Sequence, residues 1–201
     1  DKPWDWKGIS RNPNLTIEMI EKYPDKLWDW KGISYNPNIT MDFLENNLKY
    51  WYWNRISKNP NMTMEIIEKN PDKYWDWMWI SANPNLTIEM IDKYPDKDWC
   101  WIAISENPNI TMEIIEKHLD KPWNWKYGVS INQNLTMEFI EKNSDKDWDW
   151  ECVSGNPAIT MEIIEKNPDK DWDFSCLHKN PNFDISLIDK YPDKDWDFKE
   201  I

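Results

Sequence analysis

The chain has 201 residues, of which 30% are charged, 17 are tryptophan and only 4 are glycine, and its formal net charge is −13. This balance argues against nucleic-acid binding, because a phosphate backbone is recognised by clustered Lys and Arg, and no apolar run approaches the roughly 20 residues that span a bilayer. The acidic excess is concentrated in residues 145–201, which hold 15 acidic and 7 basic side chains and are suited to a basic partner.

Aromatic pairs separated by one residue recur along the whole chain. Their first members are Trp4, Trp28, Trp51, Trp75, Trp99, Trp123, Trp148, Trp172 and Trp196. The spacings are 24, 23, 24, 24, 24, 25, 24 and 24 residues, and a fixed period of this length is typical of repeat proteins. No linker interrupts the series, so residues 1–201 are predicted to form a single continuous array. Two interpretations of its incomplete end copies stay open: a fragment of a longer array, or an array that stacks end to end.

Each copy is expected to begin with a turn and a short helix. In residues 12–14, Asn-Pro-Asn is turn chemistry. Thr16 follows as a predicted N-cap, and Glu18 lies in the first turn, where the helix dipole favours an anion. The last copy has Asp184 in the cap position, and Asp is another strong N-cap. The sequence therefore predicts a helix over residues 17 to about 23.

A second helix is expected to begin near Lys26, capped by Asp25, and to carry both Trp28 and Trp30. Residues i and i+2 of a helix face nearly opposite sides, so one indole is expected to pack inside its own helix pair and the other against the next pair. Helices this short are marginal alone, and each Trp buries roughly 150–250 Å². The predicted fold is all-α: a right-handed or otherwise twisted α-solenoid of about eight short helix-turn-helix repeats.

Two copies depart from the period. The 23-residue spacing contains Asn47-Leu48-Lys49-Tyr50 and lacks the Asp of the other copies. The 25-residue spacing adds a residue between Lys126 and Ile131, and the turn that follows has no proline. We expect the stack to bend or open first at these two copies.

The fixed residues of the repeat carry a resemblance. They are the Asn-Pro-Asn turn of residues 83–85, the helix start of Thr111 and Glu113, and the pair Trp75 and Trp77. Over the whole chain, these copies resemble a family of tandem-repeat proteins encoded by giant viruses of amoebae. The resemblance implies a virus-encoded repeat protein in the host cytoplasm or the virion, and it implies no mechanism. The departures from the family pattern concern turns and packing: Gln133, Ala158, Phe174 and Phe198.

No arrangement of catalytic residues recurs in the copies. Residues 145–149 have the D-x-D-x-D spacing of a calcium loop, but Trp150 replaces the glycine required at the sixth position. Acidic residues at a helix start explain this spacing better. His118 and His178 occupy unrelated positions of the repeat, and four glycines supply no phosphate-binding loop. We therefore expect a protein that is not an enzyme and has no cofactor and no metal site.

Cysteines and sequons bear on the compartment. Cys152 and Cys176 occupy the same position in adjacent copies, on the order of 10 Å apart and beyond the roughly 7 Å reach of a disulfide. Reduced thiols favour an intracellular protein over a secreted one. Six Asn-x-Thr sequons are interpreted as incidental, because the turn and the N-cap already require Asn and Thr. They begin at Asn14, Asn38, Asn61, Asn85, Asn109 and Asn134.

Binding in repeat proteins uses positions that vary over a constant frame. Here these are the two residues after each aromatic pair and the residue before each Asn turn. Because Tyr, Trp and Arg are enriched at interface hot spots, the variable positions yield these candidate partner-binding residues: Lys31, Tyr35, Arg55, Lys58, Trp79, Glu106 and Tyr127. Neutral variation on a solvated edge is the alternative explanation of the same positions.

The leading hypothesis is a non-enzymatic scaffold that binds a protein or peptide. A structural or virion component that self-associates end to end is the second hypothesis. Carbohydrate binding through exposed aromatic side chains is the third, although a Trp at every packing position is more often part of the core.

Overall fold

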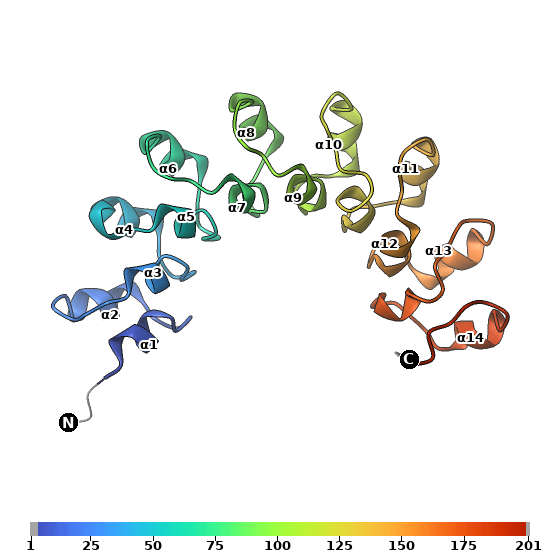
Figure 1. Ribbon diagram of the computed structural model, residues 1–201, viewed down its shortest axis with the longest axis horizontal. Helices are drawn as coiled ribbons and strands as arrows, with labels where there is room; N and C mark the ends of the chain where they lie inside the picture. The colour runs from blue at the N-terminus through green and yellow to red at the C-terminus, as the bar shows by residue number, and fades with distance from the viewer. Residues whose placement is uncertain (1–3, 200–201) are drawn as a thin grey trace. The chain divides into compact units, whose positions relative to one another are not determined.

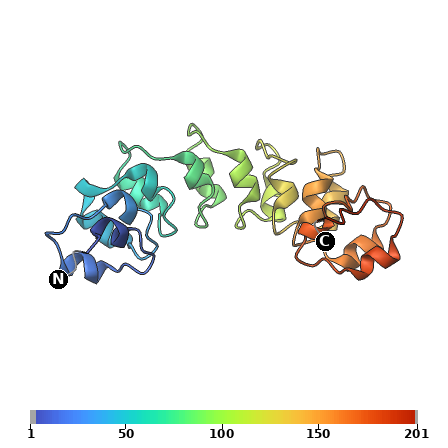
Figure 2. The same ribbon diagram turned by 60° about the horizontal axis from the view of Figure 1, so that its bottom comes forward.

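The computed structural model describes residues 4–199, and in that range the chain consists of fourteen short α-helices, three 3₁₀ helices and loops, with no strand (Figures 1 and 2). The prediction of an all-helical repeat protein is confirmed. Among these helices, none is long and apolar enough to serve as a membrane span. The chain divides into two compact units, the N-terminal unit up to Trp99 and the C-terminal unit from Cys100 onward.

In the N-terminal unit the α-helices alternate between two rows (Figure 1). The first row follows the Asn turns and consists of α2 (Ile17–Lys22), α4 (Met41–Asn46), α6 (Met64–Lys69) and α8 (Ile88–Lys93). The second row follows the aromatic pairs and consists of α1 (Trp6–Ser10), α3 (Trp30–Ile33), α5 (Trp53–Ile56) and α7 (Trp77–Ser81). One 3₁₀ helix, η1 (Leu48–Tyr50), lies between α4 and α5.

The C-terminal unit repeats this layout. Its first row consists of α10 (Met112–Lys117), α11 (Met137–Lys142), α13 (Met161–Lys166) and α14 (Ser186–Lys190). Its second row consists of α9 (Trp101–Glu106), η2 (Val129–Ile131), α12 (Trp150–Gly155) and η3 (Leu177–Lys179).

The first-row helices begin where the sequence predicts. Thr16 precedes α2, and its hydroxyl accepts a hydrogen bond from the backbone N–H of Met19 at 3.4 Å. Leu15 and Ile20, on either side of the cap, are both buried, as expected of a hydrophobic staple. The last copy differs: Asp184 accepts a bond from the N–H of Ser186 at 2.9 Å, but α14 begins only at Ser186.

The second-row helices begin four residues later than predicted. α3 starts at Trp30, and its N-cap is Asp29, not Asp25; the Asp29 carboxylate accepts a bond from the N–H of Gly32 at 3.3 Å. Trp28 stays outside the helix, because its indole N–H donates to the carbonyl of Tyr23, at the end of α2, at 3.0 Å. The opposite faces of one helix therefore do not separate the two indoles. A loop segment holds the first, and the first helical turn holds the second.

The predicted division of labour between the indoles is confirmed despite this correction. The second aromatic residue of each pair meets the first Trp of the next pair edge-on, with ring centroids 4.9–5.5 Å apart and interplanar angles of 75–89°. Such edge-to-face contacts add about 0.5–1.5 kcal/mol beyond area burial. The first Trp is buried in most copies; Trp148 is half-buried, and Trp4 is 73% exposed.

Asparagine side chains join consecutive repeats. The amide Nδ2 of Asn36 donates to the carbonyl of Asn12 at 2.9 Å, and that of Asn59 donates to the carbonyl of Asn36 at 3.0 Å. The Oδ1 of each of these residues accepts an N–H within its own turn. In the C-terminal unit, Asn156 and Asn180 continue the pattern. Each Asn thus closes its own turn and binds the turn before it.

Buried serines form a second joint. The hydroxyl of Ser57 donates to the carbonyl of Trp53 at 3.0 Å, one turn back in α5, and accepts the N–H of Asp76 in the next repeat at 2.9 Å. The same pair of bonds is made by Ser10 and Ser34 in this unit. Because these hydroxyls are buried, their bonds avoid the cost of an unsatisfied polar group.

The irregular copies show how the changed spacings are accommodated. In the 23-residue copy, Trp51 donates to the carbonyl of Leu44 at 2.9 Å, and Tyr52 supplies no side-chain cap to α5. In the 25-residue copy, Gly128 and Val129 both donate to the carbonyl of Asn124. A Cβ at Gly128 would lie 2.4 Å from the Cβ of Ser105, so the close approach requires glycine.

Candidate partner-binding surface

The second-row helices bring the variable positions of consecutive repeats into contact. The guanidinium of Arg55 lies 5.1 Å from the ring centroid of Tyr35 and donates a hydrogen bond to its hydroxyl. The ammonium of Lys58 lies 4.0 Å from the ring centroid of Trp79 and 5.9 Å from that of Tyr35. Four of the seven candidate residues therefore form one group, the cationic–aromatic cluster of Tyr35, Arg55, Lys58 and Trp79.

This cluster follows a rule of position. The residue before an Asn turn touches the third residue of the second-row helix in the next repeat, as Tyr35 touches Arg55 and Lys58 touches Trp79. In the first repeats the same two positions are Arg11 and Gly32, where a Cβ on Gly32 would lie 2.8 Å from the Cγ of Arg11. Arg11, which was not among the candidates predicted from the sequence, thus repeats this placement one copy earlier in the N-terminal unit.

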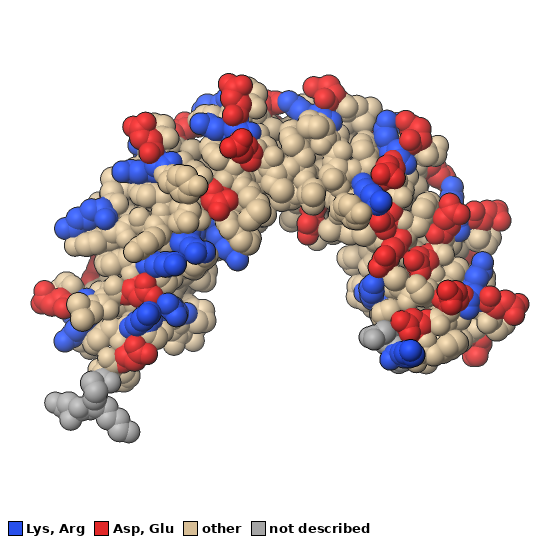
Figure 3. Space-filling model, viewed as in Figure 1, with Lys and Arg blue, Asp and Glu red and all other residues tan. Residues whose placement is uncertain are grey.

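The side chains of the cluster are accessible to different degrees. Lys58 is exposed, whereas Tyr35, Arg55 and Trp79 are half-buried. Lys31, a further candidate on α3, is exposed. Figure 3 shows Lys and Arg side chains gathered over α3 and α5. The cluster is therefore a surface in which ammonium and guanidinium groups lie against aromatic rings.

Ion pairing distinguishes two first-row lysines of this unit from the cations of the candidate surface. Lys69 and Lys93 pair with carboxylates of the preceding repeat: Lys69 lies 2.8 Å from Glu45, and Lys93 lies 2.6 Å from Glu68. The hydrogen bond from Lys93 lowers the pKa of the Glu68 carboxyl below its usual range. Within residues 4–199, no ion pair is found for Lys31, Arg55 or Lys58.

The last two candidates belong to the C-terminal unit. Glu106 is exposed at the end of α9, and Tyr127 is exposed in the loop before η2. The Lys126 ammonium lies 5.3 Å from the Tyr127 ring centroid. A hydrogen bond with Tyr127 raises the pKa of Lys126. Among the described residues, no hydrogen bond joins Glu106 and Tyr127.

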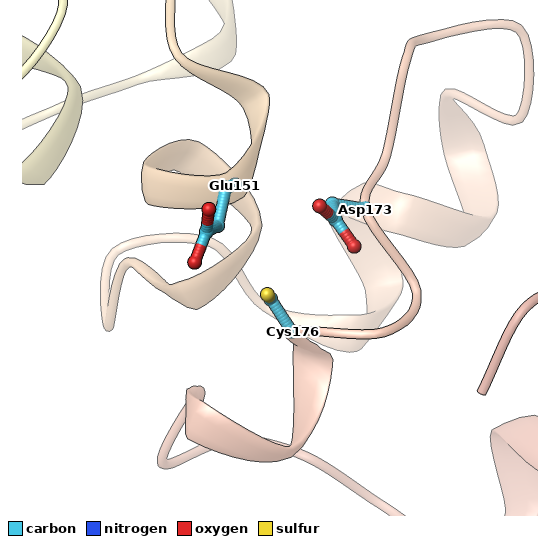
Figure 4. Close-up of side chains that lie close together, drawn as sticks. All are labelled: Glu151, Asp173 and Cys176. Atoms are coloured by element: carbon cyan, nitrogen blue, oxygen red, sulfur yellow. The ribbon is translucent and has the colours of Figure 1, made fainter. Parts of the chain in front are cut away.

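Three potential metal ligands converge in the C-terminal unit, and the sequence analysis did not foresee them. Figure 4 shows the side chains of Glu151, Asp173 and Cys176 directed toward one another, with ligand atoms within 4.8 Å. The ammonium of Lys179 lies 3.0 Å from Glu151 and 3.5 Å from the Cys176 sulfur. This cation balances the carboxylate and lowers the pKa of Glu151. The group is therefore explained as a lysine-centred ion pair.

The three cysteines are free thiols. Burial, followed by the nearby charge of Asp149, raises the pKa of Cys152 to about 11. A thiol with such a pKa stays protonated near neutral pH and is a poor nucleophile.

Lysines cover many of the half-buried indoles. Lys26, Lys73 and Lys97 place their ammonium groups 5.4–5.6 Å from the ring centroids of Trp6, Trp53 and Trp77. A sugar that stacks on an indole uses the same ring face that a cation occupies. These contacts give a structural reason for the Lys that lies two residues before most aromatic pairs. The indoles of the second row are covered by these lysines and belong to the packing.

One end of the N-terminal unit carries an apolar hollow of about 460 Å³. Its wall includes Trp4, Trp6, Met19 and Trp28. At equivalent places further along the unit, the preceding first-row helix contributes the carbonyl to which the Trp indole donates, as α6 does for Trp75.

Comparison with models of protein families, with curated proteins and with solved structures gives no match. The function of the chain is therefore inferred from its own residues and their geometry.

Proposed function

We propose that the chain is a non-enzymatic scaffold that binds a protein or peptide along the exposed edge of its second-row helices. The constant residues of the repeat are engaged in holding the repeats together: Asn36 and Ser57 in the joints, Thr16 in a cap and Trp75 in the core. The variable residues are left to differ on a rigid frame, which is how repeat proteins acquire binding surfaces.

The cationic–aromatic cluster is the observation that carries this proposal. It combines Tyr, Arg and Trp, the residue types most enriched at interface hot spots. Its members come from three successive repeats and touch one another through Arg55 and Lys58.

Affinity purification from expressing cells tests the proposal. Two double variants are compared, and each replaces two cationic side chains by neutral glutamine. Arg55→Gln/Lys58→Gln alters the cluster, whereas Lys69→Gln/Lys93→Gln alters two first-row lysines of the same unit. We expect the first variant to lose specific partners that the second retains, as measured by quantitative mass spectrometry. Identical partner sets for both variants and the wild type would contradict a binding role of this surface.

The proposal also covers the architecture of the array, its family and the place where it acts. We propose that the repeats form one twisted α-solenoid, that the protein belongs with the repeat proteins of giant viruses, and that it acts in the host cytoplasm or the virion. The acidic residues gathered over α13 and α14 (Figure 3), in the segment that carries the acidic excess, are suited to a basic partner.

A structural component that assembles end to end is a second candidate. The apolar hollow beside Trp4 supports it, because Trp4 is 73% exposed there, and exposed apolar patches mark interaction sites. Light scattering over a range of concentrations should then give a rising mass, which Trp4→Ser abolishes and Tyr74→Ser, at another exposed aromatic residue, does not. A monodisperse monomer at all concentrations would contradict this candidate.

A further inference from the structure

We propose that the cationic–aromatic cluster, together with Lys31, docks an extended acidic peptide segment of a protein partner. This inference rests on the proposed scaffold function and names the chemistry of its partner. The docking surface is basic, although the chain as a whole has a net charge of −13.

The cations of this surface lie close together and are not neutralised by carboxylates, although the chain contains 37 Asp and Glu against 24 Lys and Arg. On the first row of the same unit, Lys69 and Lys93 do find carboxylates, Glu45 and Glu68. Over residues 4–199, Lys31, Arg55 and Lys58 find none. Their charges are thus available to a partner's carboxylates.

A substitution within the repeat keeps Arg55 unpaired. In neighbouring copies the N-cap of the second-row helix is Asp29 or Asp76, and the Asp29 carboxylate lies 3.5 Å from the place of a Cβ on Gly32, the position that Arg55 occupies in its own copy. In the copy that carries Arg55, the same position is Tyr52. The carboxylate that would have neutralised the guanidinium is therefore absent from its own helix.

Aromatic rings orient the cations of the cluster. The ring of Tyr35 lies against the Arg55 guanidinium, and Lys58 lies between the rings of Tyr35 and Trp79. Contacts of this kind restrict long side chains before a ligand arrives, which lowers the entropy lost on binding. The Nε of Arg55 is buried and its Nη1 donates to the Tyr35 hydroxyl, which leaves the remaining Nη N–H groups for a carboxylate.

The spacing of the cations selects an extended peptide. Lys31 and Arg55 belong to adjacent repeats, α3 and α5, and packed helices lie about 8–10 Å apart. An extended chain advances about 3.3 Å per residue, so carboxylates three positions apart match cations one repeat apart. A nucleic acid is disfavoured, because its denser charge would be repelled by the acidic remainder of the surface.

The probe that tests this inference is a fluorescein-labelled peptide in which Glu-Ser-Gly is repeated four times. Its partner probe has the same composition with the four glutamates adjacent. Fluorescence anisotropy with the full chain is measured at low ionic strength, where the Debye length is about 30 Å, and again at higher salt. We expect the spaced peptide to bind more tightly than the blocked one, and salt to weaken both.

Variants locate the site. Arg55→Gln/Lys58→Gln should weaken binding of the spaced peptide by about tenfold or more. Lys69→Gln/Lys93→Gln, with the same change in charge on the first row, should leave binding within about twofold. Circular dichroism and thermal melting confirm that each variant is folded. Equal losses in the two variants would overturn the inference, because they would show an effect of net charge alone.

A twelve-nucleotide oligothymidine forms the third arm. If it binds at the cluster and the glutamate peptides do not, the assigned partner class is wrong. If none of the probes binds, the inference is also overturned. In either case the scaffold proposal is still supported when the Arg55/Lys58 variant loses a cellular partner that the control variant retains.

Discussion

The side-chain amide of Asn59 donates to the backbone carbonyl of Asn36, one repeat earlier, at 3.0 Å. Asn59 is fully buried, and its Oδ1 accepts the N–H of Asn61 in its own turn at 2.9 Å. One side chain therefore fixes the local turn and its position against the neighbouring repeat.

Replacing this residue should separate the two roles. We expect Asn59→Ala to lower the free energy of unfolding by about 2–3 kcal/mol, because the carbonyl of Ser34 loses its side-chain donor and that of Asn36 keeps only the N–H of Ile39. Asn12→Ala is the matched control: Asn12 closes an equivalent turn, but no inter-repeat bond of its amide is found in the described residues. Its cost should be about 1 kcal/mol or less. Urea unfolding followed by circular dichroism measures both, and equal losses would contradict the role given to the joint.

Substitutions of Trp75 should show how much of its contribution to the free energy of unfolding comes from its indole N–H group. Its indole donates to the carbonyl of Asn70 at 2.9 Å, and its ring meets Trp53 edge-on. Trp75→Phe keeps an aromatic ring and should cost about 1–2 kcal/mol, whereas Trp75→Ala should cost about 3–5 kcal/mol. Tyr74→Ala, at an exposed neighbour, should stay within about 0.5 kcal/mol in the same unfolding measurement.

The sequons can be tested in a secretory host. The amide nitrogen of Asn61, which would carry a glycan, donates to the carbonyls of Pro37 and Ile39 at 2.6 and 3.1 Å. A glycan there would break these bonds between repeats. Asn14 is exposed, and its amide makes no such bond in the described part of the chain. In folded protein we expect glycans at Asn14 and not at Asn61, as read by peptide mass spectrometry. A fully glycosylated Asn61 in protein of unchanged melting temperature would contradict this.

Cys152 should react with thiol reagents only at high pH. Burial raises its pKa to about 11, and the thiolate is the reactive form. In Cys100→Ser/Cys176→Ser protein, reaction with Ellman's reagent should be slow at neutral pH and accelerate as the pH approaches this value. The same protein in urea should follow an ordinary thiol pKa of about 8.5. Identical pH profiles in the two conditions would contradict the buried environment.

The irregular copies are expected to open first. α5 lacks the side-chain cap that Asp29 and Asp76 give to their helices, and η2 replaces an α-helix. Hydrogen exchange should therefore be faster in residues 47–56 and 124–131 than in the equivalent segments of regular copies. Uniform protection along the chain would show that the changed spacings carry no local loss of stability.

The features that the sequence predicts correctly depend on local interactions. Thr16 caps the helix that follows it within three residues, so the first-row helices can be located from their own residues. The start of the second helix could not be decided in this way, because Asp25 and Asp29 are both good caps. The contact of Trp28 with the end of α2 decides between them, and that contact exists only in the folded repeat.

The candidate surface was predictable as a set of positions but not as a set of contacts. The period aligns Tyr35 with Lys58, yet in the structure Tyr35 contacts both Arg55 and Lys58. This offset comes from the way in which neighbouring second-row helices pack, and spacing does not reveal it. The inter-repeat donation by Asn59 was missed for the same reason: the turn chemistry explains the residue without it.

The serine joints have a consequence for how such a chain can change over generations. Both partners of the Ser57 hydroxyl, the carbonyl of Trp53 and the N–H of Asp76, are main-chain groups. The amino acid that supplies the N–H is therefore free to differ, and it is Asp29 after Ser10 but Tyr52 after Ser34. The serine hydroxyl of one repeat binds a backbone N–H of the next, and every amino acid except proline supplies this group. Repeats with different residues at that position can therefore replace one another. A gene encoding them can gain, lose or exchange a unit by recombination, and the new neighbours already fit.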